Sequence, residues 1–245
     1  MVTGVAFQEA VESARQHPRL AVGLHLVLIA GEAVLSPQEI PRIVDKQGRF
    51  PLNPFVAGSR YQCHPAARAQ VRLEIRAQLE KFRRTGLKLS HVDGHQHLHM
   101  IPIVLSALIG LSREFGIRAI RIPSEELRVA LRLDGSDFLE KGKLAFFFGM
   151  LRRSSKRRLE SAGIRCPERV YGLLQSGRMT EDYLLKLIPR IRANRVEVYS
   201  HPTMDAHASS PRGASRPQLE ALMSGRVREA LVQQGFRLAT HFEMN

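Results

Sequence analysis

The sequence has 245 residues, of which 44% are hydrophobic and 24% charged, and these proportions exclude a disordered or a fibrous protein. Its formal net charge is +14, because 37 lysines and arginines outnumber 23 acidic residues. No apolar run reaches the roughly 20 residues that cross a bilayer, and two cysteines without disulfide spacing, together with no secretory profile after Met1, predict a cytoplasmic protein.

The first half of the chain predicts helices and strands in alternation. In chain order the hydrophobic spacing favours a helix over residues 7–16, a buried strand over 20–28, a helix over 66–85, a strand over 87–93, a helix over 101–115 and a strand over 117–122. Residues 30–65 are polar and rich in Pro and Gly, which predicts a long loop. Gly86 and Gly116 stand where helices end, and Pro102 stands in a first helical turn.

The second half continues this pattern. It predicts a helix over 137–162, a short strand near Val170, a helix over 180–193, a strand over 196–199, a helix over 217–234 and a strand over 236–239. Strand followed by helix, repeated along the chain, is typical of a mainly parallel α/β sheet. No linker interrupts it, so residues 1–245 are expected to form a single domain. An open doubly wound sheet and a closed barrel both fit this order.

Ionisable residues occupy every second position of one segment: His91, Asp93, His95, His97 and His99. A straight strand would spread them over roughly 26 Å, so one metal ion could not meet them all. Gly94 can end the strand and let the chain turn, which brings two or three side chains to a common point. Asp93 and His95 flank that turn and are the best candidates for a metal site or an acid/base site.

Three more polar residues end other predicted strands. His25 lies within an apolar strand, His201 follows the strand over 196–199, and Arg121 stands late in the strand over 117–122. The carboxyl ends of parallel strands share one edge, where active sites form, so these residues are expected to converge with the histidine-rich segment. Arg121 is expected either to bind an anionic or polyhydroxylated substrate there or to be a solvated strand end.

This set of residue types favours metal-assisted hydrolysis. Imidazole is a frequent ligand for Zn²⁺ and other transition ions, and a nearby carboxylate or histidine can move protons. Neither Cys63 nor Cys166 stands near the histidines, which argues against a cysteine nucleophile. The chain has no Gly-rich phosphate loop, which excludes the common kinase and dehydrogenase classes.

Charge supports two competing functions. A net charge of +14 is expected of nucleic-acid-binding proteins, although arginines scattered over solvent-facing helices explain it equally well. The apolar residues 144–151 precede a basic cluster that comprises Arg152, Arg153, Lys156, Arg157 and Arg158. That order suits either a core-packing helix with a solvated basic end or a segment that docks on an anionic membrane.

Several motifs together resemble the YdjC-like carbohydrate deacetylases, and among them the hopanoid-biosynthesis-associated branch. They are GLHLVL, VDKQGRF, HVDGHQHLHMIPIV, RIPSE and SHP, in that order along the chain. The resemblance implies a distorted, TIM-like (β/α) barrel and hydrolysis of the N-acetyl group of an amino sugar. It further implies a divalent metal, usually Mg²⁺, with Zn²⁺ as the alternative. A lipid-linked sugar, contact with the inner membrane surface and a homodimer are also expected.

The resemblance implies a role for each candidate residue. His25 and His95 match the metal-binding histidines, and His201 matches the histidine expected to protonate the leaving amine. Asp93 would orient the site. His97 and His99 would support the loop and, with Arg121, line the substrate site.

One motif of the family is missing from this sequence. The family's first strand ends in a paired-aspartate motif, ADDFG, whereas no two aspartates are adjacent here and the residues after Met1 resemble a later segment. The chain is therefore expected to lack the first βα unit of the barrel. By itself it is expected to be a poor or inactive deacetylase, the alternative being an inactive relic.

Overall fold

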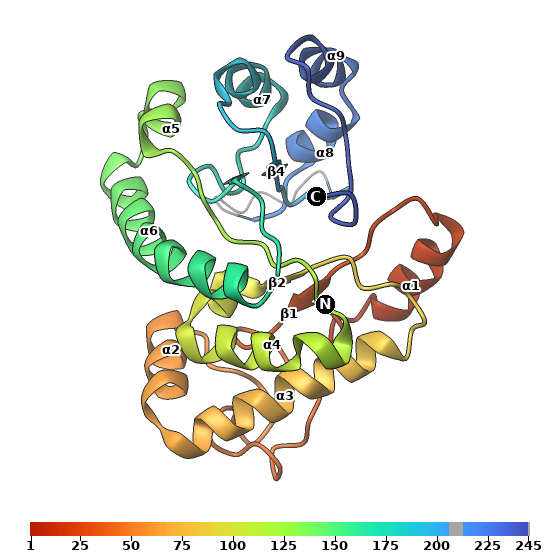
Figure 1. Ribbon diagram of the computed structural model, residues 1–245, viewed down its shortest axis with the longest axis vertical. Coiled ribbons are helices and arrows are strands. Elements are labelled where there is room, and N and C mark those ends of the chain that lie inside the picture. Colours follow the sequence, from red (N-terminus) through yellow and green to blue (C-terminus); the bar gives the residue numbers. More distant parts are fainter. Residues whose placement is uncertain (206–212, 245) are drawn as a thin grey trace. The chain divides into compact units, whose positions relative to one another are not determined.

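A computed structural model describes residues 1–205 and 213–244 of the chain, which contain both helices and short strands (Figure 1). The helices are α1 (Phe7–Gln16), α2 (Pro54–Cys63), α3 (Pro65–Arg83), α4 (Pro102–Phe115), α5 (Leu127–Leu133), α6 (Phe138–Ser161), α7 (Glu181–Leu187), α8 (Arg216–Met223) and α9 (Gly225–Gln233), with 3-10 helices η1 (His95–Met100) and η2 (Ile188–Arg190). The strands are β1 (Leu24–Leu26), β2 (Val92–Gly94), β3 (Arg169–Tyr171) and β4 (Val196–Val198).

The chain divides into two compact units. Unit 1 comprises Met1–Ile122, Arg153–Cys166 and Thr240–Asn245, and unit 2 comprises Pro123–Arg152 and Pro167–Ala239. Each unit therefore contains segments that are distant in sequence, and helix α6 contributes residues to both.

Unit 1 is built around the parallel pair β1–β2. Leu24 lies opposite Val92, and Leu26 lies opposite Gly94. The segment after α4 continues this arrangement, because Val92 forms a parallel bridge with Ile120. Leu24, Val92 and Ile120 are completely buried, as expected of strands covered on both faces.

Helices α3 and α4 pack against each other, α3 also contacts β1, and α4 contacts η1. Helix α4 begins with Pro102 and ends at Gly116, whose φ of 66° is the left-handed conformation that glycine adopts without strain. The buried residues of the two helices recur at helical spacing: Val71, Ile75 and Leu79 on α3, and Val104, Leu108 and Leu111 on α4. This spacing fixes which face of each helix meets the core.

Unit 2 repeats the same plan on a smaller scale. Strands β3 and β4 pair in parallel, with Val170 opposite Glu197. The helical segments α7, α8, α9 and η2 contribute to its core, whose most deeply buried members include Tyr171, Leu187 and Ala221. Apolar side chains from segments far apart in sequence thus stabilise a very short sheet.

The predicted helices are largely confirmed, with two omissions and two breaks. Helix α2 lies inside the predicted loop over 30–65, where Asn53 accepts hydrogen bonds from the amides of Phe55 and Val56 at 2.9 and 3.2 Å. Helix α5 was not predicted. The predicted helix over 217–234 is two helices, because Ser224 caps α9, and the one over 180–193 changes to a 3-10 turn at η2.

The predicted strands are longer than the observed ones, and one prediction is wrong. In the part of the chain that the structure describes, residues 236–239 form no strand. Leu238 is 73% exposed, so this segment lacks the burial that favours a strand. Residues 117–122 contribute only isolated bridges at Ala119 and Ile120.

The observed architecture is mixed α/β with parallel strand pairs, as expected. The described residues form two sheets of two strands each, and a closed barrel stays a prediction. None of the helices within the described residues combines the length and the apolar character that a bilayer crossing requires.

Candidate active site in unit 1

The parallel strand pair brings the first candidate histidine beside the candidate aspartate. His25 lies directly opposite Asp93 in the register of β1 and β2. Side chains of residues paired in this way point to the same face of the sheet. The His25 ring therefore lies beside Asp93 and donates a hydrogen bond from Nδ1 to Asp93 Oδ1 at 3.0 Å. Because Nδ1 carries this hydrogen bond, Nε2 is the His25 nitrogen that remains for a metal ion or a substrate.

Asp93 holds two side chains at once. It is 6% exposed, and its second oxygen, Oδ2, accepts a hydrogen bond from the guanidinium of Arg121. Burial by itself would raise the pKa of Asp93, but the hydrogen bond from His25 and the charge of Arg121 outweigh it and hold the pKa well below its usual value. Asp93 is therefore a permanent anion that orients its two neighbours.

The backbone after Asp93 turns sharply, as the position of Gly94 predicted. Gln96 and His97 both adopt the left-handed conformation, with φ of 49° and 56°. Such a conformation is uncommon outside glycine and recurs at ligand-binding sites. The turn places the His95 ring edge-on to the His25 ring, with 5.7 Å between the ring centroids. His25, Asp93 and His95 thus form one cluster.

His97 and His99 continue the turn into the interior. Their ring centroids are 6.0 Å apart, and His99 is only 1% exposed. Burial lowers the pKa of His97 to about 3 and that of His99 to about 4, so both rings are neutral at neutral pH. His99 donates from Nε2 to the Arg121 carbonyl at 2.7 Å, which ties the loop to the next strand segment. Their contact with substrate stays a prediction.

Arg121 reaches the same cluster from the segment after α4. Its backbone amide donates to the Val92 carbonyl at 3.0 Å, and its side chain is 14% exposed. The guanidinium is therefore not a solvated strand end, because it points inward to Asp93. Whether substrate also meets Arg121 stays a prediction.

His201 belongs to unit 2, where it follows β4. Its amide donates to Gln218 Oε1, and its carbonyl accepts from Gln218 Nε2, both at 3.1 Å. The His201 ring stands edge-on to Tyr199, with 5.8 Å between centroids. Gln218 thus fixes the backbone that carries this exposed ring, and the convergence of His201 with the unit 1 histidines stays a prediction.

Two buried polar residues of α3 hold the segment that follows β1, and both were missed in the sequence. Gln78 accepts a hydrogen bond from the Val27 amide at 3.0 Å and donates to the Val27 carbonyl at 2.6 Å. Glu74 accepts from the amides of Val34 and Leu35 at 2.9 and 3.0 Å. Glu74 and Gln78 share a helix face with Val71 and Ile75, and polar residues at such core positions are the signal that identifies them.

A histidine near the end of the described chain was also missed. His241 stacks on His91, with 3.9 Å between the ring centroids and 21° between the planes. A Cβ atom on Gly23 would lie 2.5 Å from the His91 ring, so any larger residue there would force this ring to shift. The position of His241 in the sequence carried no motif that would have revealed this contact.

Glu125 of the RIPSE motif is a buried carboxyl group in unit 2. Its Oε2 atom accepts hydrogen bonds from the amides of Gly172 and Leu174 at 3.2 and 2.9 Å. Burial raises the pKa of Glu125 to about 7, because these bonds only partly offset the loss of solvation.

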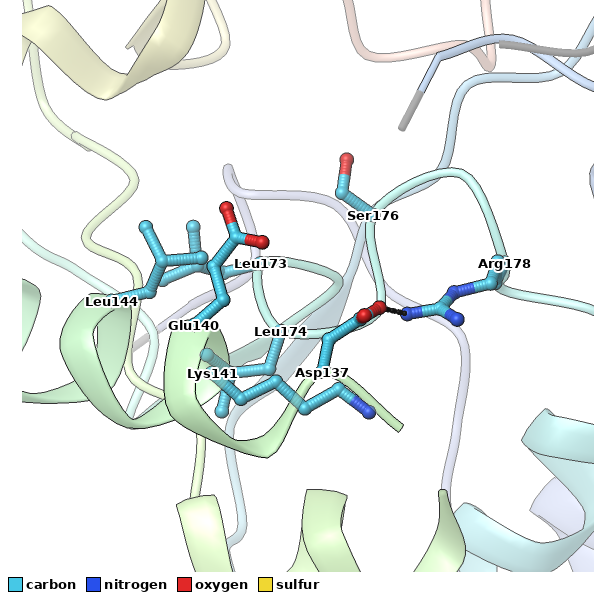
Figure 2. A pocket seen from close by; sticks show the side chains of 8 residues that line it. All are labelled: Asp137, Glu140, Lys141, Leu144, Leu173, Leu174, Ser176 and Arg178. Atoms are coloured by element: carbon cyan, nitrogen blue, oxygen red, sulfur yellow. Dashed lines mark hydrogen bonds and ion pairs between the residues drawn. The ribbon is translucent and has the colours of Figure 1, made fainter. Parts of the chain in front are cut away.

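Unit 2 also contains a small pocket (Figure 2). Its charged lining residues largely engage groups of the chain itself. Arg178 donates to Asp137 at 2.8 Å, as Figure 2 shows, and the buried Lys141 donates to the Asp134 carbonyl at 2.7 Å. None of the candidate residues from the sequence lines this pocket, so it is not the predicted site.

Comparisons with known proteins agree on one family. A family model described as YdjC-like protein matches residues 1–233. A carbohydrate deacetylase of Brevibacillus brevis is 38% identical over 125 residues, which are 50% of this chain and 46% of that protein. A carbohydrate deacetylase of Homo sapiens is 30% identical over 182 residues, covering 73% of this chain and 54% of that protein. The chain thus spans about half the length of the curated relatives that it matches.

A solved structure from Enterococcus faecalis V583, described as a candidate cellobiose-phosphate cleavage protein, shares the fold. The TM-score is 0.71 at 23% sequence identity, and the match covers 100% of this chain and 85% of that one.

Proposed function

Since the chain belongs to the YdjC-like family, we propose that it takes part in metal-dependent removal of the N-acetyl group from an acetylated amino sugar. The carbohydrate deacetylases among its relatives support the reaction class. The observation that carries the proposal is the cluster in unit 1, where Asp93 orients His25 and the next turn brings His95 alongside.

The donor set of this cluster fits a divalent cation. Asp93 engages Nδ1 of His25 and thereby directs Nε2 outward, which is the usual arrangement behind a metal-ligating histidine. His25 and His95 are the proposed ligands. Imidazole nitrogens suit Zn²⁺ and similar ions, whereas Mg²⁺, which the family resemblance favours, prefers oxygen and would need further oxygen ligands.

Each residue has a proposed part in amide hydrolysis. A bound divalent cation supplies positive charge that polarises the acetamide carbonyl. Asp93 keeps His25 in one tautomer and one orientation, while Arg121 neutralises the buried carboxylate. His97, His99 and Arg121 are proposed to border the substrate, and His201 is proposed to protonate the leaving amine.

The remaining features of the proposal rest on the family resemblance. By this resemblance the proposed fold is a single barrel-shaped domain, and the paired aspartates of the family's first strand, which this sequence does not contain, are proposed to contribute to activity. A hopanoid-type, lipid-linked sugar is the proposed substrate, and the cytoplasmic side of the inner membrane is the proposed location.

Acetate release tests the proposed activity. The purified chain, and the chain extended by a segment that carries the paired aspartates, are incubated with an N-acetylglucosamine oligosaccharide and either Mg²⁺ or Zn²⁺. We expect metal-dependent acetate release from the extended chain and at least tenfold less from the 245-residue chain. Equal release from both would refute the need for the aspartates, and no release from either would refute deacetylation of this oligosaccharide.

Titration calorimetry of metal binding tests the ligands separately from activity. His25→Ala and His95→Ala are each expected to abolish binding of Zn²⁺, because each removes one proposed ligand. His64→Ala is the matched control, since His64 is exposed at the start of α3 and should leave affinity unchanged. Unchanged affinity in the His25 or His95 variant would remove that residue from the ligand set.

A further inference from the structure

Helix α6 exposes apolar side chains and then basic ones along a single row. The row comprises Leu139, Lys143, Phe146, Met150, Arg153 and Arg157. These residues recur every three or four positions and therefore lie on one helix face. Leu139, Phe146 and Met150 are 65%, 71% and 55% exposed, whereas large apolar side chains are most often buried in folded proteins.

The opposite face of α6 is covered by the rest of the chain. Lys141 and Ser155 are each 2% exposed, Phe148 is 9% exposed and Leu159 is completely buried. In the first half of α6, the covered side thus carries Phe148 and the ion-paired Lys141, while Leu139 and Phe146 face outward. Several large apolar side chains exposed on one helix face mark a surface that is suited to a further partner.

The charge of the open side identifies the partner's chemistry. Between Lys141 and Leu159 the sequence contains no acidic residue. Arg152 and Arg158 turn to the chain itself, donating to the carbonyls of Glu168 and Pro102 at 3.3 and 3.2 Å. Lys143, Arg153 and Arg157 stay exposed beside the apolar residues. The partner must therefore offer an apolar interior bordered by negative charge.

We infer that α6 lies flat on an anionic membrane surface. Leu139, Phe146 and Met150 would enter the boundary between headgroups and acyl chains, while Arg153 and Arg157 would meet lipid phosphates. The row from Leu139 to Arg157 is about 27 Å long at 1.5 Å per residue, which is long enough to lie along a bilayer. A second copy of the chain is a poorer partner, since it would bring the same cations against this row.

Vesicle co-sedimentation tests this inference, and the assay needs no enzymatic activity. The purified chain is mixed with phosphatidylglycerol-containing vesicles or with pure phosphatidylcholine vesicles. We expect pelleting with the anionic vesicles, and much less at 1 M salt, where screening shortens electrostatic interactions to about 3 Å. Arg153→Gln/Arg157→Gln should weaken the partition coefficient by about thirtyfold, and Phe146→Ser/Met150→Ser by at least tenfold.

Matched controls separate the effect of this row from the effects of total positive charge and of exposed apolar side chains elsewhere on the chain. Arg84→Gln/Arg113→Gln removes the same charge from two other exposed arginines, and Leu222→Ser/Val232→Ser removes two other exposed apolar side chains. Both control pairs should bind as the unchanged chain does. Equal binding by all variants, or no binding to anionic vesicles, would overturn the inference. Self-association of the chain that Phe146→Ser/Met150→Ser abolishes would overturn it too, because a second copy would then cover the row.

Discussion

Asp93 connects two residues of the candidate site, since one carboxylate orients His25 and neutralises Arg121. The sequence predicted that Asp93 and His95 lie together at a strand end, and the alternation of ionisable residues with Gly94 was sufficient for that. The Asp93–Arg121 pair was not predictable, because the two residues come from different segments and only the parallel bridge between Val92 and Ile120 aligns them.

Replacing Asp93 by Asn should destabilise unit 1 strongly. The change removes the negative charge of Asp93 from its pair with the largely buried guanidinium of Arg121, and breaking such a buried pair costs about 3 kcal/mol. Urea unfolding of the purified variant measures the loss. Glu114→Gln is the control, because its pair with Arg76 is exposed and should contribute far less. Equal losses in the two variants would show that Asp93 has no special structural role.

Among the elements, helices were predictable and strands were much less so. Pro102 stands at the first position of α4, where its fixed φ favours a helix start, and Gly116 follows the last residue in the left-handed conformation that glycine favours. Both signals are local and can be read from the sequence. Strand β1 is three residues long, although the apolar run predicted a strand of nine. Only these three residues pair with a neighbouring strand. That pairing depends on tertiary contacts that a local pattern does not contain.

The turn after β2 depends on the absence of a side chain at Gly94. A Cβ atom there would lie 2.8 Å from Nδ1 of His99, whose ring is buried and tied to the Arg121 carbonyl. Gly94→Ala should therefore displace the ring and cost about 2 kcal/mol of stability in urea unfolding.

Gly149→Ala is the matched control for that variant. Nothing lies within 4 Å of the added Cβ at this position in α6, and alanine favours helix, so stability should rise slightly. A stable Gly94→Ala variant with an unchanged metal affinity would contradict the importance of the packing between Gly94 and His99.

At the scale of the whole molecule, a buried carboxyl group with a raised pKa and two buried histidines with lowered pKa values should determine how stability depends on pH. Burial raises the pKa of Glu125 from 4.5 to about 7. Its contribution to the free energy of unfolding is therefore complete below pH 4.5 and is lost as the pH rises through 7. His97 and His99 have pKa values lowered from 6.5, so their contribution is complete above pH 6.5 and is lost as the pH falls toward 4.

The free energy of unfolding should accordingly be greatest at about pH 6.5. Urea unfolding between pH 4 and 9 measures this curve. Glu125→Gln keeps an oxygen for the amides of Gly172 and Leu174 and removes the titration, so the decline above pH 6.5 should flatten in that variant. Parallel curves for the two proteins would show that Glu125 does not titrate in this range.

The contact between Gln78 and Val27 has a consequence for association between chains. A strand with unpaired amides and carbonyls at the margin of a narrow sheet is a template onto which another molecule can add. The Gln78 side chain occupies both hydrogen-bonding groups of Val27, as a neighbouring strand would. A single amide side chain thus occupies the hydrogen-bonding groups of the residue that follows β1, which leaves them unable to pair with a strand of another molecule.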